Sequence, residues 1–263
     1  MGRLELRKTF GEDAELYDRV RPTYPIRMYD DVARMLGRVA RPRVLEIGCG
    51  TGQATVPMVR RGWSVKAVEL SPALGGIARD KLPELEVIVA DFDTWPLPAE
   101  RFDLVLSATA FHWLDPATRV GKAADALRPG GVLAVVSTHH VAGGSSEFWA
   151  EVRECYERFT DDADRSSMPT PDSVVGDEDE IAASGRFEPA RVHRYEWELT
   201  YTAAEYLELL SSYSGHRALT EQARDGLYNC IRALIEASGG SVTKRYLTLL
   251  TAANRLHQPL ALG

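Results

Sequence analysis

Cysteine is scarce in this sequence, which limits the kinds of site that the chain can build. The 263 residues include 3 cysteines, Cys49, Cys155 and Cys230, far apart and without the CxxC or Cys/His spacing of zinc ligands. We therefore expect neither a metal site nor a disulfide. Cys155 and Cys230 are interpreted as small buried apolar residues on helices, and Cys49 as a small residue within a loop. The neighbours His139 and His140 predict no metal pair, because adjacent residues of a strand point to opposite faces.

Long apolar runs and blocks of basic charge are also missing. No apolar segment approaches the roughly 20 residues that span a bilayer, and the sequence does not start with a basic-then-apolar signal pattern. We expect a cytoplasmic protein that does not enter a membrane. The net charge is −7 without a dense run of Lys and Arg, so we expect a small-molecule substrate and no nucleic acid. A monomer and a homodimer both remain open.

What the sequence does contain is an alternation of short apolar segments with helical periods. The pattern predicts strands near 43–47, 64–69, 85–90, 102–107 and 131–137. It predicts helices between them near 53–61, 72–81 and 116–128. In LRPGGVLAVVS, Pro129, Gly130 and Gly131 stop a helix, and the apolar run after them indicates a buried strand in the middle of the sheet.

The segments on either side of this core complete the expected domain organisation. Residues 1–40 are expected to form an N-terminal cap or lid, with an amphipathic helix in IRMYDDVARMLGRV, and residues 41–263 the main domain with an insertion around 139–215. The acidic stretch 161–180 predicts a mobile loop. Further predictions are helices near 146–160, 203–213 and 218–238, and strands near 190–201 and 242–252. The expected fold is α/β, doubly wound, with a mostly parallel seven-stranded sheet and an N-terminal helical cap.

The stretch VLEIGCGTGQAT, residues 44–55, indicates a strand, a tight turn and the start of a helix. Glycine tolerates positive φ and lets the backbone approach a ligand closely. A dinucleotide-binding loop has the spacing GxGxxG, whereas this loop is ExGxGxG, with Glu46 ahead of Gly48, Gly50 and Gly52. Glu69 ends the second predicted strand, and its carboxylate is suited to both hydroxyls of a ribose. Pro57 conflicts with the helix predicted after the loop.

Taken together, these segments resemble the class I S-adenosylmethionine-dependent methyltransferases, and within them the small-molecule branch that includes trans-aconitate methyltransferase-like proteins. The resemblance covers nearly the whole chain and rests on five segments in order, VLEIGCGTG, VELSP, VADFDTWPL, FDLVLSATAFHWLD and LRPGGVLAV. The N-terminal YDRVRPTYP also looks like the start of this branch, where that stretch closes over the cofactor. The resemblance implies S-adenosylmethionine as cofactor and a Rossmann-like fold.

The resemblance also implies a role for each motif residue. Gly48, Cys49, Gly50 and Gly52 would pass under the methionine and ribose part of the cofactor, while Glu46 would orient the loop or the ammonium group. Glu69 would hold the ribose, although it can also be read as a solvated acid. Asp91 would accept from the adenine amino group or, alternatively, cap a helix. The backbone of Phe92 would lie at the edge of the adenine ring, and Leu70 would pack on a face of the ring.

Methyl transfer from a sulfonium needs an aligned nucleophile more than it needs a base, because the donor is already activated. His112 and Trp113 follow the fourth predicted strand and would face the reacting end of the cleft. His112 is a candidate base or substrate donor, or else a structural histidine. Trp113 is interpreted as a pocket wall. In the cap, Tyr17, Arg21 and Tyr24 are within reach of the cofactor or substrate, and Arg21 is either a carboxylate ligand or a surface ion-pair partner.

The leading hypothesis is an enzyme that methylates a small molecule, with carboxyl O-methylation suggested by the resemblance. A catalytically silent module that holds the cofactor is the second hypothesis. A NAD-dependent oxidoreductase is disfavoured, because the loop is GxGxG and the sequence has no Tyr/Lys pair at the short spacing that such enzymes use.

Overall fold

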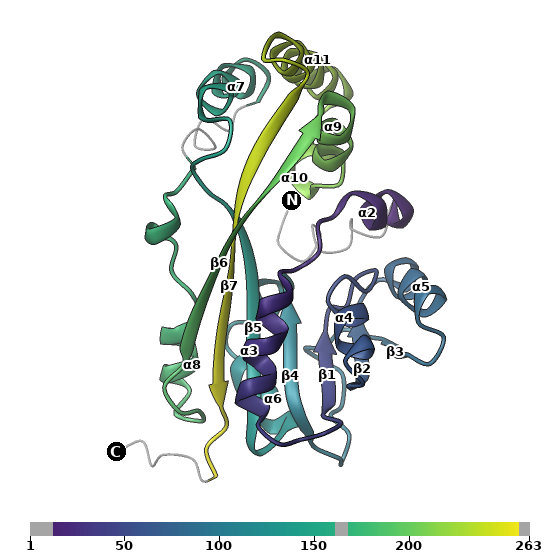
Figure 1. The fold of residues 1–263 in the computed structure, drawn as a ribbon. Helices are drawn as coiled ribbons and strands as arrows, with labels where there is room; N and C mark the ends of the chain where they lie inside the picture. Colours follow the sequence, from purple (N-terminus) through teal and green to yellow (C-terminus); the bar gives the residue numbers. More distant parts are fainter. Residues whose placement is uncertain (1–12, 161–167, 258–263) are drawn as a thin grey trace.

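The computed structural model describes residues 13–160 and 168–257, and a seven-stranded sheet forms its centre (Figure 1). The strand order is β3-β2-β1-β4-β5-β7-β6. β7 is antiparallel to both of its neighbours, and the other strands are parallel to one another. The strands are β1 Arg43–Ile47, β2 Ser64–Glu69, β3 Glu86–Val89, β4 Phe102–Ala108, β5 Leu127–His140, β6 Arg191–Thr202 and β7 Ser241–Asn254. The predicted α/β fold with a mostly parallel sheet is confirmed.

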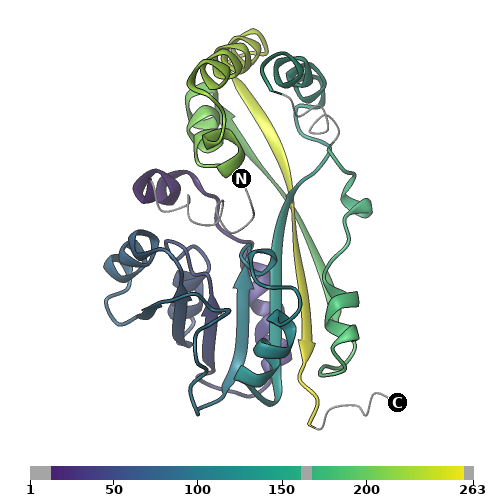
Figure 2. The same ribbon diagram turned by 180° about the vertical axis from the view of Figure 1, so that it is seen from behind.

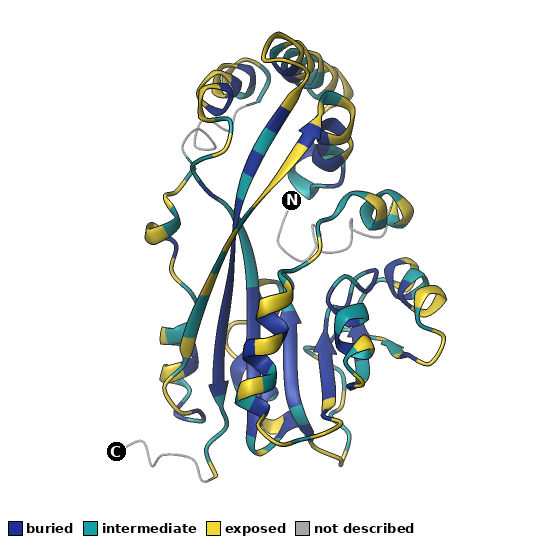
Figure 3. Ribbon diagram, viewed as in Figure 1, coloured by how far each residue is buried: buried dark blue, intermediate teal, exposed yellow. Residues whose placement is uncertain are grey.

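Helices cover both faces of the sheet, and its central strands are buried (Figure 3). Successive residues of a strand point to opposite faces, and in the central strands both sets of residues are apolar. Along β4, Leu104 and Leu106 pack toward one face and Val105 toward the other, and all three are fully buried. The first face carries α3 Ile26–Leu36, α4 Thr55–Arg60 and α5 Pro72–Lys81. The second face carries α6 Arg119–Ala126 and α8 Glu178–Ala183. This two-sided winding leaves the carboxyl ends of the parallel strands as the place for a site.

Two local expectations are settled by these helices. Pro57 lies in the first turn of α4, where a helix has no hydrogen-bond partner for the backbone N–H, so the conflict at this proline disappears. The prediction of a loop over 161–180 is wrong for its end. Residues 161–167 lie outside the described residues, but α8 begins at Glu178, with acidic residues in its first turn and Ile181 buried against the sheet.

A second group of helices lies beyond the end of the sheet, at the top of Figure 1. It consists of α7 Ser146–Phe159, α9 Ala203–Ser211, α10 Ser214–Arg217 and α11 Glu221–Ala237, and we call it the distal helix cluster. These helices share an apolar core with the ends of β6 and β7, including Tyr201 and Tyr246. Figure 2 shows the same strands running from the sheet into the cluster. The cluster therefore sits on continuous β-structure.

A disulfide joins Cys155 of α7 to Cys230 of α11, which corrects the expectation that these residues are free. Their Cα atoms are 5.8 Å apart although 75 residues separate them in sequence. The cause is tertiary, because α7 and α11 pack side by side and no spacing rule reports that contact. Cys49 is a free, buried cysteine, as its interpretation as a small loop residue requires.

The α2 helix, Ala14–Val20, lies across the carboxyl ends of the strands, whereas Met28 and Tyr29 of α3 belong to the sheet core. The division at residue 40 and the insertion around 139–215 stay predictions. Among the described residues, no helix combines the length and apolar character needed to cross a bilayer.

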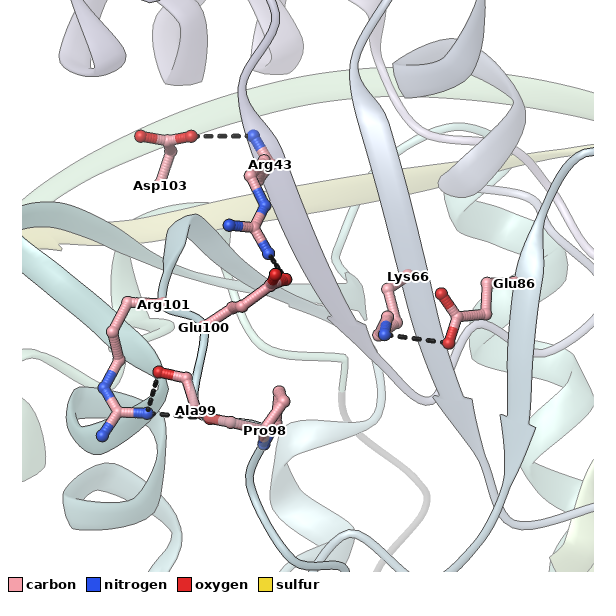
Figure 4. Close-up of polar contacts among 8 residues, drawn as sticks. All are labelled: Arg43, Lys66, Glu86, Pro98, Ala99, Glu100, Arg101 and Asp103. Atoms are coloured by element: carbon pink, nitrogen blue, oxygen red, sulfur yellow. Dashed lines mark hydrogen bonds and ion pairs between the residues drawn. The ribbon is translucent and has the colours of Figure 1, made fainter.

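The amino-terminal edge of the sheet is tied by polar contacts (Figure 4). The backbone N–H of Arg43 donates to Asp103 over 2.8 Å, and Lys66 pairs with Glu86 over 2.8 Å. Arg43 also pairs with Glu100, whose side chain is 72% exposed. Exposed pairs of this kind contribute roughly 0–1 kcal/mol each. This edge is solvated and lies opposite the cavity described next.

Candidate active site

A cavity of about 270 Å³ lies at the carboxyl ends of β1, β2 and β4, where an open α/β sheet binds ligands. Nine of the residues predicted from the sequence line it: Tyr17, Arg21, Gly48, Gly50, Glu69, Leu70, Phe92, His112 and Trp113. Five others do not line it, namely Tyr24, Glu46, Cys49, Gly52 and Asp91. We call this cavity the cofactor pocket.

The glycine loop forms the floor of the pocket and needs its glycines. Gly48, Gly50 and Gly52 have φ values of 71°, 56° and 92°, in the left-handed region that side chains rarely adopt. A Cβ on Gly48 would lie 2.5 Å from the Cβ of Ala110, so the loop that follows β4 leaves no room for a side chain there. The backbone is thereby held against the pocket.

Glu69 closes the pocket at the end of β2. Its carboxylate accepts the backbone N–H of Gly50 over 2.9 Å and that of Ser71 over 2.8 Å, and the residue is only 6% exposed. Glu69 therefore both fixes the glycine loop and lines the cavity.

Glu46 lies beneath the loop, 1% exposed, and accepts the hydroxyl of Thr55 at the start of α4 over 2.6 Å. Burial raises the pKa of Glu46 to about 7. Its contact ties the end of β1 to the start of α4, on either side of the glycine loop. Asp91 accepts the backbone N–H of Asp93 over 3.1 Å, and the next residue, Phe92, lines the cavity.

Arg21 is the residue that caps the carboxyl end of α2, and it lines the pocket. Its guanidinium lies 4.8 Å from the ring centre of Tyr17 and 4.4 Å from that of Tyr213, and it donates to the carbonyl of Ser212 over 2.8 Å. Its Nε is buried and has no acceptor among the described residues. These contacts place Arg21 in the pocket wall and do not fit its interpretation as a surface ion-pair residue.

His112 and Trp113 lie on a short 3₁₀ helix, Phe111–Trp113, directly after β4. His112 is exposed, Trp113 is half-buried, and their ring centres are 4.9 Å apart. Thr109 precedes them with a φ of 54°, and its hydroxyl lies 2.9 Å from that of Tyr24. Tyr24 thus contacts the site through Thr109.

Sequence reasoning missed Thr109, Tyr213 and Ser214 as pocket residues. Thr109 carries no signal, because its positive φ occurs without a glycine. Tyr213 and Ser214 come from the distal helix cluster, and only the tertiary fold brings them beside Arg21.

Tyr213 and Ser214 also line a second cavity of about 620 Å³, which we call the distal cavity. Its walls come from the ends of β5 and β7 and from α7, α9 and α10. Two cavities therefore meet at one shared wall, with the glycine loop on one side and the distal helix cluster on the other.

Known proteins match this arrangement at the level of sequence and fold. Residues 45–135 match the model described as Methyltransferase domain. An uncharacterized methyltransferase of Mycobacterium tuberculosis is 30% identical over 260 residues, which cover 95% of this chain and 97% of that protein. The chain belongs to the methyltransferase family.

Solved structures agree on the fold. A protein from Anaeromyxobacter dehalogenans described as a type II methyltransferase has a TM-score of 0.59 and 24% identity, covering 91% of this chain and 99% of that one. The phosphoethanolamine N-methyltransferase 2 of Haemonchus contortus, in complex with S-adenosylhomocysteine, has a TM-score of 0.52 and 17% identity, covering 94% of this chain and 57% of that one. The protein is an S-adenosylmethionine-dependent methyltransferase, and the pocket chemistry fits that cofactor: close backbone approach, a carboxylate at the end of β2 and apolar walls.

Proposed function

We propose that this methyltransferase methylates a carboxylate oxygen of a small-molecule acceptor. The observation that carries the proposal is the wall formed by Tyr213 and Ser214, which borders both the cofactor pocket and the distal cavity. An acceptor in the distal cavity would have its nearer end beside the pocket. The resemblance to the trans-aconitate methyltransferase-like branch supports an acid as acceptor.

We assign the cofactor contacts to the residues around the glycine loop. Gly48 and Gly50 would approach the methionine and ribose part, and Glu69 would accept from the ribose hydroxyls. Leu70 would pack on a face of the adenine, and the backbone of Phe92 would lie at its edge. Asp91 would accept from the adenine amino group, and Glu46 would hold the loop. When bound, S-adenosylmethionine supplies a methyl group that is already activated for displacement.

A carboxylate acceptor suits the donors around the reacting end. Burial raises the pKa of Tyr17, and it raises that of Tyr213 to about 12, so both hydroxyls stay protonated near neutral pH and can donate. Arg21 adds a guanidinium between the two rings. An ionised carboxylate needs donors of this kind and no base to remove a proton.

His112 is the group in the pocket that would change this assignment. If it acts as a base, His112→Ala lowers turnover and leaves the affinity for S-adenosylhomocysteine unchanged. Equal turnover of the variant at saturating acceptor would rule that role out and would agree with a carboxylate acceptor.

The test of the proposed function is methyl incorporation from labelled S-adenosylmethionine into a panel of small carboxylic acids that includes trans-aconitate, each beside its amide. Methyl esters hydrolyse in mild alkali, so label that is released by alkali identifies a carboxylate acceptor. Label that resists alkali, or incorporation into the amides, would contradict the proposal. Calorimetric binding of S-adenosylhomocysteine, with NAD as the control ligand, checks the cofactor site separately.

A further inference from the structure

Lys244 is a buried lysine in the wall of the distal cavity, and within the described residues it has no acidic partner. It lies on β7, is 3% exposed and lines the cavity. Its Nζ donates to the hydroxyl of Tyr206 over 3.3 Å, and no acidic side chain within the described part of the chain forms an ion pair with it. Burying an ammonium without a partner is costly, and such groups in proteins are normally paired.

The described wall of the distal cavity contains basic and aromatic side chains and no carboxylate. Described residues with a basic side chain in the wall are His140, Arg153, His216 and Lys244, and none of its described lining residues is Asp or Glu. This is notable because acidic residues outnumber Lys and Arg in the chain by 38 to 31. Among its described residues the wall thus offers nitrogen donors to an anion and no carboxylate that would repel one.

Aromatic rings surround the ammonium group. Nζ of Lys244 lies 5.2 Å from the ring centre of Trp149, 5.1 Å from that of Tyr206 and 6.0 Å from that of Tyr246. Tyr156 and Tyr213 also line the cavity. These walls match a ligand with an apolar or planar body, since aromatic surfaces provide large contact areas.

The position of Lys244 along β7 separates it from the reacting end. Tyr246 is opposite His140 in the β5–β7 ladder, and His140 lies 3.2 Å from the hydroxyl of Tyr213, at the shared wall. Lys244 precedes Tyr246 by two residues in β7, a separation of about 7 Å at the rise of a strand. A group held by Lys244 is therefore at the far end of the acceptor from the cofactor pocket.

We infer that the distal cavity binds a carboxylate or phosphate group of the acceptor on Lys244, a group other than the one that is methylated, with the apolar body of the acceptor against Trp149 and Tyr206. The inference rests on the proposed function for the statement that the bound anion is the acceptor. It assigns the acceptor to small acids that carry a second anionic group.

The charge state of Lys244 agrees with this geometry. Burial lowers its pKa to about 7, so part of the population is neutral at that pH when the cavity holds no anion. A bound anion favours the ammonium form and draws a proton from solution. The groups facing Lys244 that also titrate are His140, whose pKa burial lowers, and the hydroxyls of Tyr206 and Tyr246, whose pKa burial raises.

The experiment is calorimetric titration of the protein, saturated with S-adenosylhomocysteine, with phenylacetate, phenyl phosphate and the neutral phenylacetamide at pH 8. The variants are Lys244→Met and, as matched control, Lys66→Met, which removes a lysine from β2 at the opposite edge of the sheet. Repeating the titration in buffers of different ionisation enthalpy measures proton uptake.

We expect an anionic probe to bind on the order of 10–100-fold more tightly than the amide, the range typical for losing a hydrogen bond to a charged group. The advantage and the proton uptake should vanish in Lys244→Met and persist in Lys66→Met. The better of the two anions identifies the acid class. Equal binding of acid and amide, an unchanged Lys244→Met variant, or no binding of either anion would overturn the inference. Failure of S-adenosylhomocysteine to bind the wild type would instead count against the cofactor assignment.

Discussion

Removing the disulfide between α7 and α11 should destabilise the protein strongly. The bond closes a loop with a sequence separation of 75 residues, which contains α8, β6, α9 and α10. In the chain-entropy model, closing a loop of that length restricts the unfolded chain and stabilises the fold by about 4.5 kcal/mol at 25 °C. Because measured values usually fall below this model, we expect the Cys155→Ala/Cys230→Ala double variant to lose about 2–4.5 kcal/mol.

Urea unfolding at 25 °C measures this loss, with oxidised wild type, reduced wild type and the double variant compared side by side. Reduced wild type and the double variant should unfold at nearly the same urea concentration, well below oxidised wild type. Cys49→Ala is the control, because Cys49 is buried but free, so this variant should respond to reductant as the wild type does. The reasoning would be refuted by a difference in the free energy of unfolding below about 1 kcal/mol, or by a wild type whose stability does not change with reductant.

Three further predictions concern the glycine loop. Glu69→Ala should weaken binding of S-adenosylhomocysteine by on the order of 10–100-fold, as for a lost charged hydrogen bond, whereas Glu86→Ala on the exposed edge should not; calorimetry compares them. Gly48→Ala should lower the free energy of unfolding by roughly 1–3 kcal/mol and weaken the binding of S-adenosylhomocysteine, because its Cβ would meet Ala110. An unchanged melting temperature together with an unchanged affinity would contradict this. Because burial raises the pKa of Glu46 from 4.5 to about 7, stability should fall as the pH rises through that interval, by up to about 3 kcal/mol. Glu46→Gln should remove this pH dependence in urea titrations at pH 4.5 and 8.

The sequence predicted which segments lie at the carboxyl ends of β1 and β2 because these segments are local. A strand, a glycine turn and an acid at the end of the next strand are adjacent in sequence and have a fixed geometry. Gly48, Gly50 and Glu69 therefore line the pocket as expected. The roles proposed for them still require measurement.

The acceptor side was not predictable in the same way. Tyr213 reaches the pocket from the connection between α9 and α10, far along the chain, and Lys244 looks like an ordinary polar residue of a strand until the fold buries it. The prediction that Cys155 and Cys230 are free was wrong for the same reason, since the distance between them depends on how α7 packs on α11. Long-range packing decides these contacts, and a single sequence carries no periodicity that reports them.

The strands that leave the sheet and enter the distal helix cluster constrain how this protein can diversify. A one-residue insertion within β7 would turn every later side chain to the opposite face, which would disturb both Lys244 and the buried core. Insertions between α9 and α11, or between α7 and α8, leave the β-ladder unchanged and alter the walls of the distal cavity, including the wall that it shares with the cofactor pocket. Relatives with new acceptors are therefore expected to differ in the lengths of these connections and to keep the lengths of β5, β6 and β7.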